Sequence, residues 1–183
     1  MKIDQAWLKD ASQTHDFAQQ LAQAYQRWCQ SSPDATQQAL SVSFQGDLGA
    51  GKSTFVRAFV QWFLPGQKVK SPTFTLVETY PVRIEQPHAE ATAVTFVHFD
   101  CYRLADPEEL EFLGIRDLLK PPSLALVEWP DKGEGVLPQP DLVCELALAE
   151  VENPEKGRVL SLQAHTESGK QWLACMPTTA TVN

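Results

Sequence analysis

GDLGAGKS, residues 46–53, is the stretch that decides the fold of this chain. It satisfies the phosphate-loop (P-loop) pattern G-x-x-x-x-G-K-[ST], which belongs between a strand and a helix. Both neighbours are predicted, because residues 40–45 alternate between apolar and polar, and residues 55–63 repeat apolar side chains at helical spacing. Pro65-Gly66 then ends the helix. The order strand, glycine-rich loop, helix is the start of a nucleotide-binding α/β fold.

The residue types in this loop explain why it suits a phosphate group. Glycines permit backbone geometry in which consecutive amide N–H groups turn inward at the positive end of the following helix. Lys52 would reach the β and γ phosphates, and the Ser53 hydroxyl would ligate Mg²⁺. A tight glycine turn with an exposed lysine is the alternative, and the strand-to-helix context favours nucleotide binding. The predicted nucleotide-binding residues here are Asp47, Leu48, Gly49, Ala50, Gly51, Lys52, Ser53 and Thr54.

Two carboxylates stand at the ends of predicted strands. Asp100 closes the strand that begins at Val94, and Glu128 closes the apolar strand that begins at Leu124. In an open parallel sheet the carboxyl ends of the strands meet at the ligand crevice, and Mg²⁺ takes carboxylate ligands there. A solvated strand end is the alternative for either residue alone. Next to a P-loop, we expect both carboxylates to serve a metal and hydrolysis.

Three further side chains near these strand ends have open assignments. His98 lies among apolar residues, which favours a structural histidine over a catalytic base. Arg103 would face a phosphate or form a surface ion pair. Trp129 would wall the nucleotide pocket or pack in the core.

The remaining pattern completes an α/β architecture. Apolar residues recur at helical steps from Thr14 to Trp28, and residues 106–114 carry a helix start at Asp106 with Gly114 as the stop. Residues 71–80 indicate a loop feeding a short strand, residues 81–92 a polar surface excursion, and residues 142–149 with 158–165 an antiparallel pair. We therefore predict a P-loop NTPase-like sheet with flanking helices, mostly parallel in its core, with antiparallel C-terminal strands.

Composition limits the other possibilities. A chain of 183 residues with 43% hydrophobic content predicts one domain, residues 1–183. A formal net charge of −8 argues against a broad grip on nucleic acid, so contact with RNA would run through a partner. The four cysteines are scattered, and no apolar run approaches the roughly 18 residues of a membrane span. We expect a soluble protein of the reducing cytoplasm.

Five segments in order, GDLGAGKST, SPTFTLVE, HFDCYRL, ADPEELEFLGIRD and LVEWP, together resemble the bacterial ATPase family TsaE, formerly YjeE. The resemblance runs from about the first helix to the C-terminal hairpin. It implies an ATP- and Mg²⁺-dependent ATPase that supports threonylcarbamoyladenosine formation in tRNA. Its implied partners are the threonylcarbamoyl transferase TsaD and the dimerisation partner TsaB, through which it would meet tRNA indirectly.

The resemblance also assigns roles to residues. It places Ser53, Glu128 and Asp100 at the metal-associated positions, and Ser71 and Thr73 in a switch-like S-P-T segment. It places Trp129 beside the nucleotide and Thr14 near the base. The implied catalytic set is Lys52, Glu128, Asp100 and Thr73. Two departures are a serine at position 53, where the family often has threonine, and a longer segment from Tyr80 to Val94.

Rival functions differ in what else they require. A translational-type GTPase needs an N-K-x-D motif, and neither asparagine of this chain is followed by lysine. A small-molecule kinase normally uses an arginine-rich lid, and the arginines here are scattered, but this reading stays open. A nucleotide-gated interaction module, in which ATP orders residues 71–78 and hydrolysis matters little, also stays open.

Overall fold

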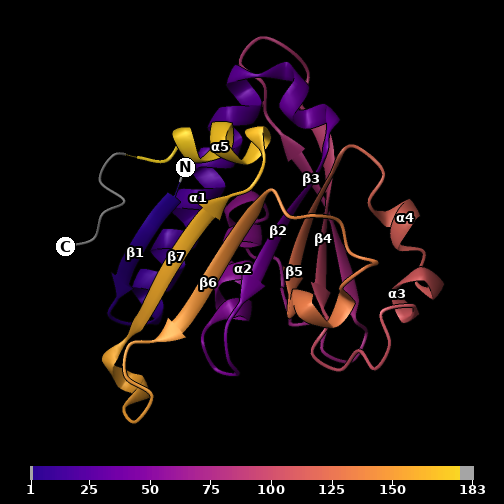
Figure 1. Ribbon diagram of the computed structural model, residues 1–183. Helices are drawn as coiled ribbons and strands as arrows, with labels where there is room; N and C mark the ends of the chain where they lie inside the picture. Colours follow the sequence, from indigo (N-terminus) through magenta and orange to yellow (C-terminus); the bar gives the residue numbers. More distant parts are fainter. Residues whose placement is uncertain (1, 178–183) are drawn as a thin grey trace.

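Seven strands form one mixed sheet in the protein, whose structure is a computed structural model describing residues 2–177. Across the sheet the strands are β1 (Lys2–Leu8), β7 (Arg158–Ala164), β6 (Leu142–Leu148), β2 (Ala39–Gln45), β5 (Ser123–Glu128), β4 (Thr92–Asp100) and β3 (Val77–Ile84). Strands β6, β2, β5 and β4 are parallel to one another, whereas β3 pairs antiparallel with β4, β7 with β6 and β1 with β7 (Figure 1). This confirms the predicted α/β class, the parallel core and the antiparallel C-terminal pair.

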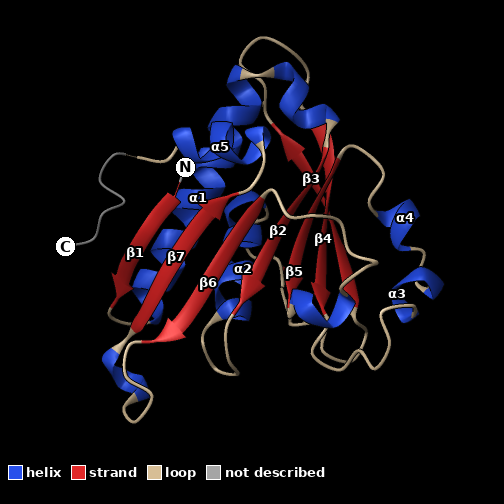
Figure 2. Cartoon of the chain, viewed as in Figure 1, coloured by secondary structure: helices blue, strands red, loops and turns tan. Residues whose placement is uncertain are grey.

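Helices pack against both faces of this sheet. Figure 2 shows the longer helices behind the strands and the short helices to the right of β4. The larger apolar core lies between the sheet and α1 (Ala11–Ser31), α2 (Lys52–Phe63) and α5 (Glu167–Ala174). A smaller cluster on the other face joins β4 and β5 to the short helices α3 (Glu109–Phe112) and α4 (Ile115–Leu118). Three 3-10 turns complete the described elements: η1 (Pro33–Gln37), η2 (Pro130–Gly133) and η3 (Pro154–Lys156).

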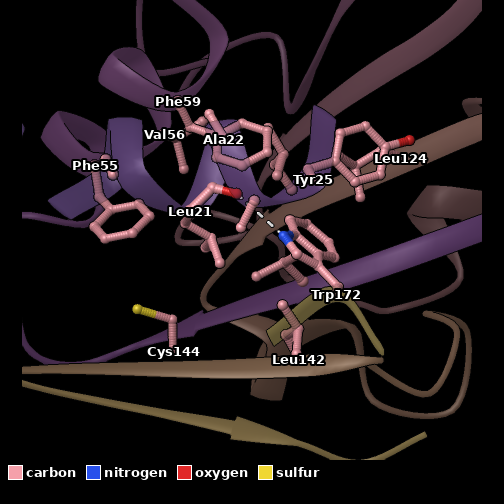
Figure 3. Close-up of a cluster of buried hydrophobic side chains, with 14 of the residues drawn as sticks. Leu21, Ala22, Tyr25, Phe55, Val56, Phe59, Leu124, Leu142, Cys144 and Trp172 are labelled. Atoms are coloured by element: carbon pink, nitrogen blue, oxygen red, sulfur yellow. Dashed lines mark hydrogen bonds between the residues drawn. The ribbon is translucent and has the colours of Figure 1, made fainter. Parts of the chain in front are cut away.

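Trp172 of α5 is the largest fully buried side chain of the core. Its ring centroid lies 4.8 Å from that of Tyr25 on α1, and its indole N–H donates to the Leu21 carbonyl at 3.1 Å (Figure 3). A buried indole needs such a partner because an unpaired N–H in an apolar core is costly. This contact fastens α5 to α1 behind the sheet.

The register of the parallel strands decides where the candidate site lies. Phe44 of β2 is opposite Glu128 of β5, and Glu128 is in turn opposite Asp100 of β4. The P-loop leaves β2 two residues after Phe44. Both strand-end carboxylates and the loop therefore meet at one edge of the sheet, as the sequence predicts.

The prediction that residues 81–92 form a surface excursion is wrong for its first part. Strand β3 continues to Ile84 and pairs with β4 along its whole length. Val82 and Ile84 are buried, and Pro81 is tolerated because β3 lies at the sheet edge. Tertiary pairing outweighs the local signal of a proline and charged residues.

The helix predicted from Asp106 is shorter than expected. Residues 106–108 form a turn, and α3 starts at Glu109. Glu109 Oε1 nevertheless accepts the backbone N–H of Asp106 at 3.0 Å, a contact typical of a helix start. Gly114, with φ of +72°, ends the segment and precedes α4. Strand β1 and helix α5 were not predicted from the sequence.

Candidate functional site

Positive-φ glycines shape the P-loop between β2 and α2. Gly46 has φ of +134°, and a Cβ there would lie 2.0 Å from the Leu146 carbonyl oxygen, so no side chain fits. Gly49 and Gly51 have φ of +80° and +109°, and Gly51 immediately precedes the first residue of α2. These conformations favour glycine, and they explain the spacing of the motif.

Lys52 is buried at the centre of the loop. Its ammonium donates to the carbonyl oxygens of Gly46 and Asp47, at 2.5 and 2.9 Å, and lies 3.7 Å from the ring centroid of Trp129. Trp129 holds φ of +58°, a strained value for a bulky residue. Burial lowers the pKa of Lys52, and Glu128 foremost among nearby carboxylates opposes that shift. The strand-end carboxylates thus favour the charged form that a phosphate-binding lysine needs.

Glu128 connects the loop to the interior of the sheet. Its Oε2 accepts the Ser53 hydroxyl at 2.7 Å, and its Oε1 lies 2.8 Å from Nε2 of His98. Both Glu128 and His98 are almost wholly buried, and Nδ1 of His98 is a buried atom that has no hydrogen-bond partner among the described residues. His98 therefore supports Glu128, which agrees with the interpretation of a structural histidine.

Asp100 holds the S-P-T segment against the same edge. Its Oδ2 accepts the hydroxyls of Ser71 and of Thr73, the latter at 2.8 Å, and the two hydroxyls lie 2.7 Å apart. Its Oδ1 accepts the backbone N–H of Tyr102 at 3.1 Å. Asp100 is buried, and its carboxylate connects Ser71 and Thr73 to the end of β4.

Two cavities adjoin at the P-loop. The first, about 290 Å³, has Lys52 and Ser53 in its wall together with Leu48, Gly49, Gly51, Thr54, Ser71, Thr73, Asp100, Tyr102, Glu128 and Trp129. The second, about 430 Å³, shares Gly49, Gly51 and Thr54 and continues to Thr14 on α1 and to the turn containing Pro154 and Glu155. An elongated ligand with a phosphate end could occupy both.

Most sequence-predicted site residues meet in these cavities. Thr14 lines the larger cavity, and its hydroxyl donates to the Asp10 carbonyl at 3.2 Å. Asp47 and Ala50 belong to the loop through their carbonyl oxygens, which accept from Lys52 and Arg158. The guanidinium of Arg103, whose assignment the sequence left open, lies 4.4 Å from the ring centroid of Phe74.

The donor set suits Mg²⁺ better than a transition metal. No group of three or more histidine, cysteine, aspartate and glutamate side chains forms a ready-made metal cage within residues 2–177. Mg²⁺ requires less from the protein, since one or two carboxylates, a hydroxyl, phosphates and water complete its shell. Ser53, Glu128 and Asp100 can supply that part.

Comparison with known proteins shows the family of this chain. A family model described as "Threonylcarbamoyl adenosine biosynthesis protein TsaE" matches residues 8–173. The chain belongs to the TsaE family. It is 43% identical over 135 residues to the "tRNA threonylcarbamoyladenosine biosynthesis protein TsaE" of Haemophilus influenzae, which covers 74% of this chain and 77% of that protein.

Other TsaE relatives and one solved structure are also similar. The Rickettsia bellii protein of the same name is 37% identical over 108 residues, covering 58% of this chain and 68% of that protein. The Bacillus subtilis protein is 35% identical over 98 residues, covering 54% and 55%. The crystal structure of Bacillus subtilis YdiB superposes with a TM-score of 0.67 over 95% of this chain and 93% of that one; at 21% identity it shows a shared fold.

Within this TsaE-family chain, sequence reasoning missed several site residues. Tyr102 lies 5.0 Å from Trp129, ring centroid to centroid, and Arg158 reaches the P-loop from the start of β7. No local pattern marks Arg158, because its contact joins segments far apart in the sequence.

The segment from Tyr80 to Val94, which is longer than the family pattern, lies in the β3–β4 hairpin. None of the helices in residues 2–177 combines the length and apolar character needed to cross a membrane.

Proposed function

We propose that this protein is the ATP-binding and ATP-hydrolysing component of threonylcarbamoyladenosine modification of tRNA. It acts with TsaB and TsaD type proteins, meets tRNA through them, and works in the cytoplasm. Membership of the TsaE family supports the pathway, since relatives carry that role in their names. The P-loop and its surroundings support the chemistry.

One observation carries the ATPase proposal. The Ser53 hydroxyl, at the start of α2, is 2.7 Å from Glu128 Oε2, and Asp100 lines the same cavity. A glycine turn that only packs a helix on a strand needs neither a buried carboxylate against the serine nor a second one beside it. Burying charged groups is costly, so their convergence favours a function that uses negative charge.

The chain's own residues would bind and orient the phosphates. Backbone amides of the P-loop would surround them, and the Lys52 ammonium would move from the carbonyls of Gly46 and Asp47 toward the β and γ oxygens. Ser53, Glu128 and Asp100 would hold Mg²⁺, which would neutralise the charge that develops on the phosphates. Thr14 and the larger cavity would take the nucleoside end.

We further propose that turnover by the isolated protein is slow and that the partner pair accelerates it. Phosphoryl transfer commonly exploits an arginine beside the γ phosphate. Among residues 2–177, no arginine lines the cavity that contains Lys52 and Ser53. A partner could complete the site, and the segment 71–78 would report the nucleotide state to it through the contacts of Ser71 and Thr73 with Asp100.

A reconstituted tRNA modification assay tests the function. Modified tRNA should form with the wild-type protein, and should fail to form when it is omitted or replaced by Lys52→Ala. Lys120→Ala is a matched control, because this lysine is exposed and pairs with Asp117 away from the P-loop. Modification at the wild-type rate with Lys52→Ala would contradict the proposal.

Phosphate release measured with and without TsaB and TsaD separates the alternatives. Partner-stimulated release is the expected result. Nucleotide-dependent partner binding without any release would favour the interaction module instead. Rapid turnover by the protein alone, with phosphate appearing on a small-molecule acceptor, would favour a kinase.

A further inference from the structure

Two cationic side chains, Lys52 and Arg158, donate hydrogen bonds to four carbonyl oxygens of the P-loop. Lys52 takes those of Gly46 and Asp47. Arg158, the first residue of β7, takes the other two: its Nε donates to the Ala50 carbonyl and its Nη2 to the Gly49 carbonyl, each at 3.2 Å. The same guanidinium therefore touches two consecutive peptide groups at the tip of the loop.

The third nitrogen of the Arg158 guanidinium bonds the connection between β6 and β7. This nitrogen, Nη1, donates to the carbonyls of Pro154, at 2.5 Å, and of Gly157, at 3.0 Å. That connection packs closely against the end of β1. A Cβ added to Gly157 would lie only 2.4 Å from the Leu8 carbonyl oxygen. Arg158 thus ties the P-loop to a closely packed corner of the sheet.

Peptide geometry gives this contact a consequence for phosphate binding. In a planar trans peptide, the C=O of one residue and the N–H of the next point in opposite directions. When Arg158 holds the Ala50 carbonyl, the N–H of Gly51 points away from Arg158. The N–H of Ala50 is likewise turned away and donates to the Asp47 carbonyl at 3.1 Å. Through the Ala50 carbonyl, Arg158 therefore helps orient the Gly51 N–H toward the phosphate side of the loop, whereas the Ala50 N–H is already used within the loop.

The two cations differ in what a nucleotide would require of them. Under the proposed function, on which this inference rests, Lys52 leaves its carbonyls to reach the phosphates. Arg158 stands in the wall of the larger cavity and not in the wall of the cavity with Lys52 and Ser53. It can keep its carbonyls throughout, so it is suited to maintain the loop when Lys52 changes partners.

We propose that Arg158 is a positioning residue for phosphate binding, which acts from the wall of the larger cavity by fixing the peptide groups that carry the Gly49 and Ala50 carbonyls. A guanidinium is needed because Arg158 bonds four carbonyl oxygens from three different nitrogens, whereas a lysine ammonium has three donors on a single atom.

Calorimetry with Mg²⁺ tests this with two ligands, ADP and inorganic pyrophosphate. Arg158→Gln should raise the Kd of ADP and of pyrophosphate by the same factor, about tenfold or more, because the charge-assisted hydrogen bonds from Arg158 to the loop carbonyls are lost. Arg158→Lys should recover only part of the affinity. Arg116→Gln is the control, since Arg116 is exposed and pairs with Glu111 on the other face of the sheet. Thermal unfolding should show that all three variants are folded.

Weaker ADP binding with unchanged pyrophosphate binding would overturn the proposal, because Arg158 would then contact the nucleoside directly. Full affinity in Arg158→Lys or Arg158→Gln would also overturn it. A second measurement needs no ligand: hydrogen exchange of the peptide containing Gly49–Gly51 should be faster in Arg158→Gln than in Arg116→Gln. Equal exchange would contradict the positioning role, even if the wild-type protein bound neither ligand and the proposed function itself failed.

Discussion

His98 and Glu128 form a buried pair across neighbouring strands, with Nε2 of the imidazole 2.8 Å from Oε1 of the carboxylate. The other carboxylate oxygen accepts the Ser53 hydroxyl. His98 thus fixes Oε1 of Glu128 from inside the sheet, while Oε2 of Glu128 faces the P-loop. Within residues 2–177, Nδ1 of His98 has no hydrogen-bond partner, so Nε2 is the ring nitrogen that carries the contact with Glu128.

We expect His98→Ala to lower ATP turnover and to cost about 1–3 kcal/mol of stability, since it leaves a buried carboxylate oxygen without its donor. His98→Gln places an amide N–H near the position of Nε2 and should restore turnover in part. Steady-state hydrolysis and thermal unfolding of both variants check this. Equal turnover in His98→Ala and wild type would show that Glu128 needs no support from His98.

Glu128→Gln and Asp100→Asn should impair hydrolysis much more than folding, because each amide keeps the side-chain shape and removes the negative charge. The Mg²⁺ concentration needed for half-maximal ATP binding should rise in both variants. Glu145→Gln is a control, as this carboxylate bonds Ser161 on β7 outside the cavity. Wild-type turnover and Mg²⁺ dependence in both variants would remove these carboxylates from the metal site.

Thr73→Ala should weaken the partner-stimulated rate while leaving basal ATP affinity nearly unchanged. Its hydroxyl bonds Asp100 at 2.8 Å, so its loss frees the switch segment without touching the P-loop amides. Thr75→Ala is the control, because the Thr75 hydroxyl is exposed and makes only a 3.5 Å contact with Glu78. Phosphate release with and without TsaB and TsaD measures the effect, and a loss confined to the basal rate would refute it.

Thiol chemistry should distinguish the buried cysteines from Cys175. Burial raises the pKa of Cys29 to about 12 and that of Cys144 still further, and both thiols are inaccessible. Cys175 is partly exposed. A thiol reagent at pH 8 should therefore modify Cys175 first, and Cys29 and Cys144 only after unfolding, because the thiolate is the reactive form.

The same shifts make stability fall at alkaline pH. An unfolded thiol loses its proton near its ordinary value of 9, whereas native Cys29 keeps its proton to about 12. Between these values the native state binds more protons, so unfolding becomes easier as pH rises, by about 1.4 kcal/mol per pH unit for one thiol. Chemical unfolding of Cys29→Ala beside wild type, between pH 8 and pH 10, should show a shallower decline in the variant.

The sequence predicted the elements whose signals are local. Glycine spacing and apolar periodicity within residues 40–63 predict the P-loop, the strand before it and the helix after it. Strand β5 is buried along its whole length, and its continuous apolar run shows this directly. Asp100 and Glu128 could be placed together from the sequence, because parallel strands bring their carboxyl ends to one edge.

Elements stabilised mainly by tertiary contacts escaped sequence reasoning. Strand β1 exists through its pairing with β7, and the second half of β3 through its pairing with β4, despite Pro81. Helix α5 has only eight residues and depends on the burial of Trp172 against α1. Short segments of this kind gain little from intrinsic propensity, so their own residues carry a weak signal.

By itself, then, the sequence determined which chemical groups are present and which edge of the sheet they share. Only the tertiary structure decided how each group is used. It divides the two oxygens of Glu128 between Ser53 and His98, and it brings Arg158 to the carbonyl of Ala50, 108 residues earlier in the chain. The reason is physical: hydrogen-bond partners of buried polar groups are chosen by strand register and packing, which no local pattern contains.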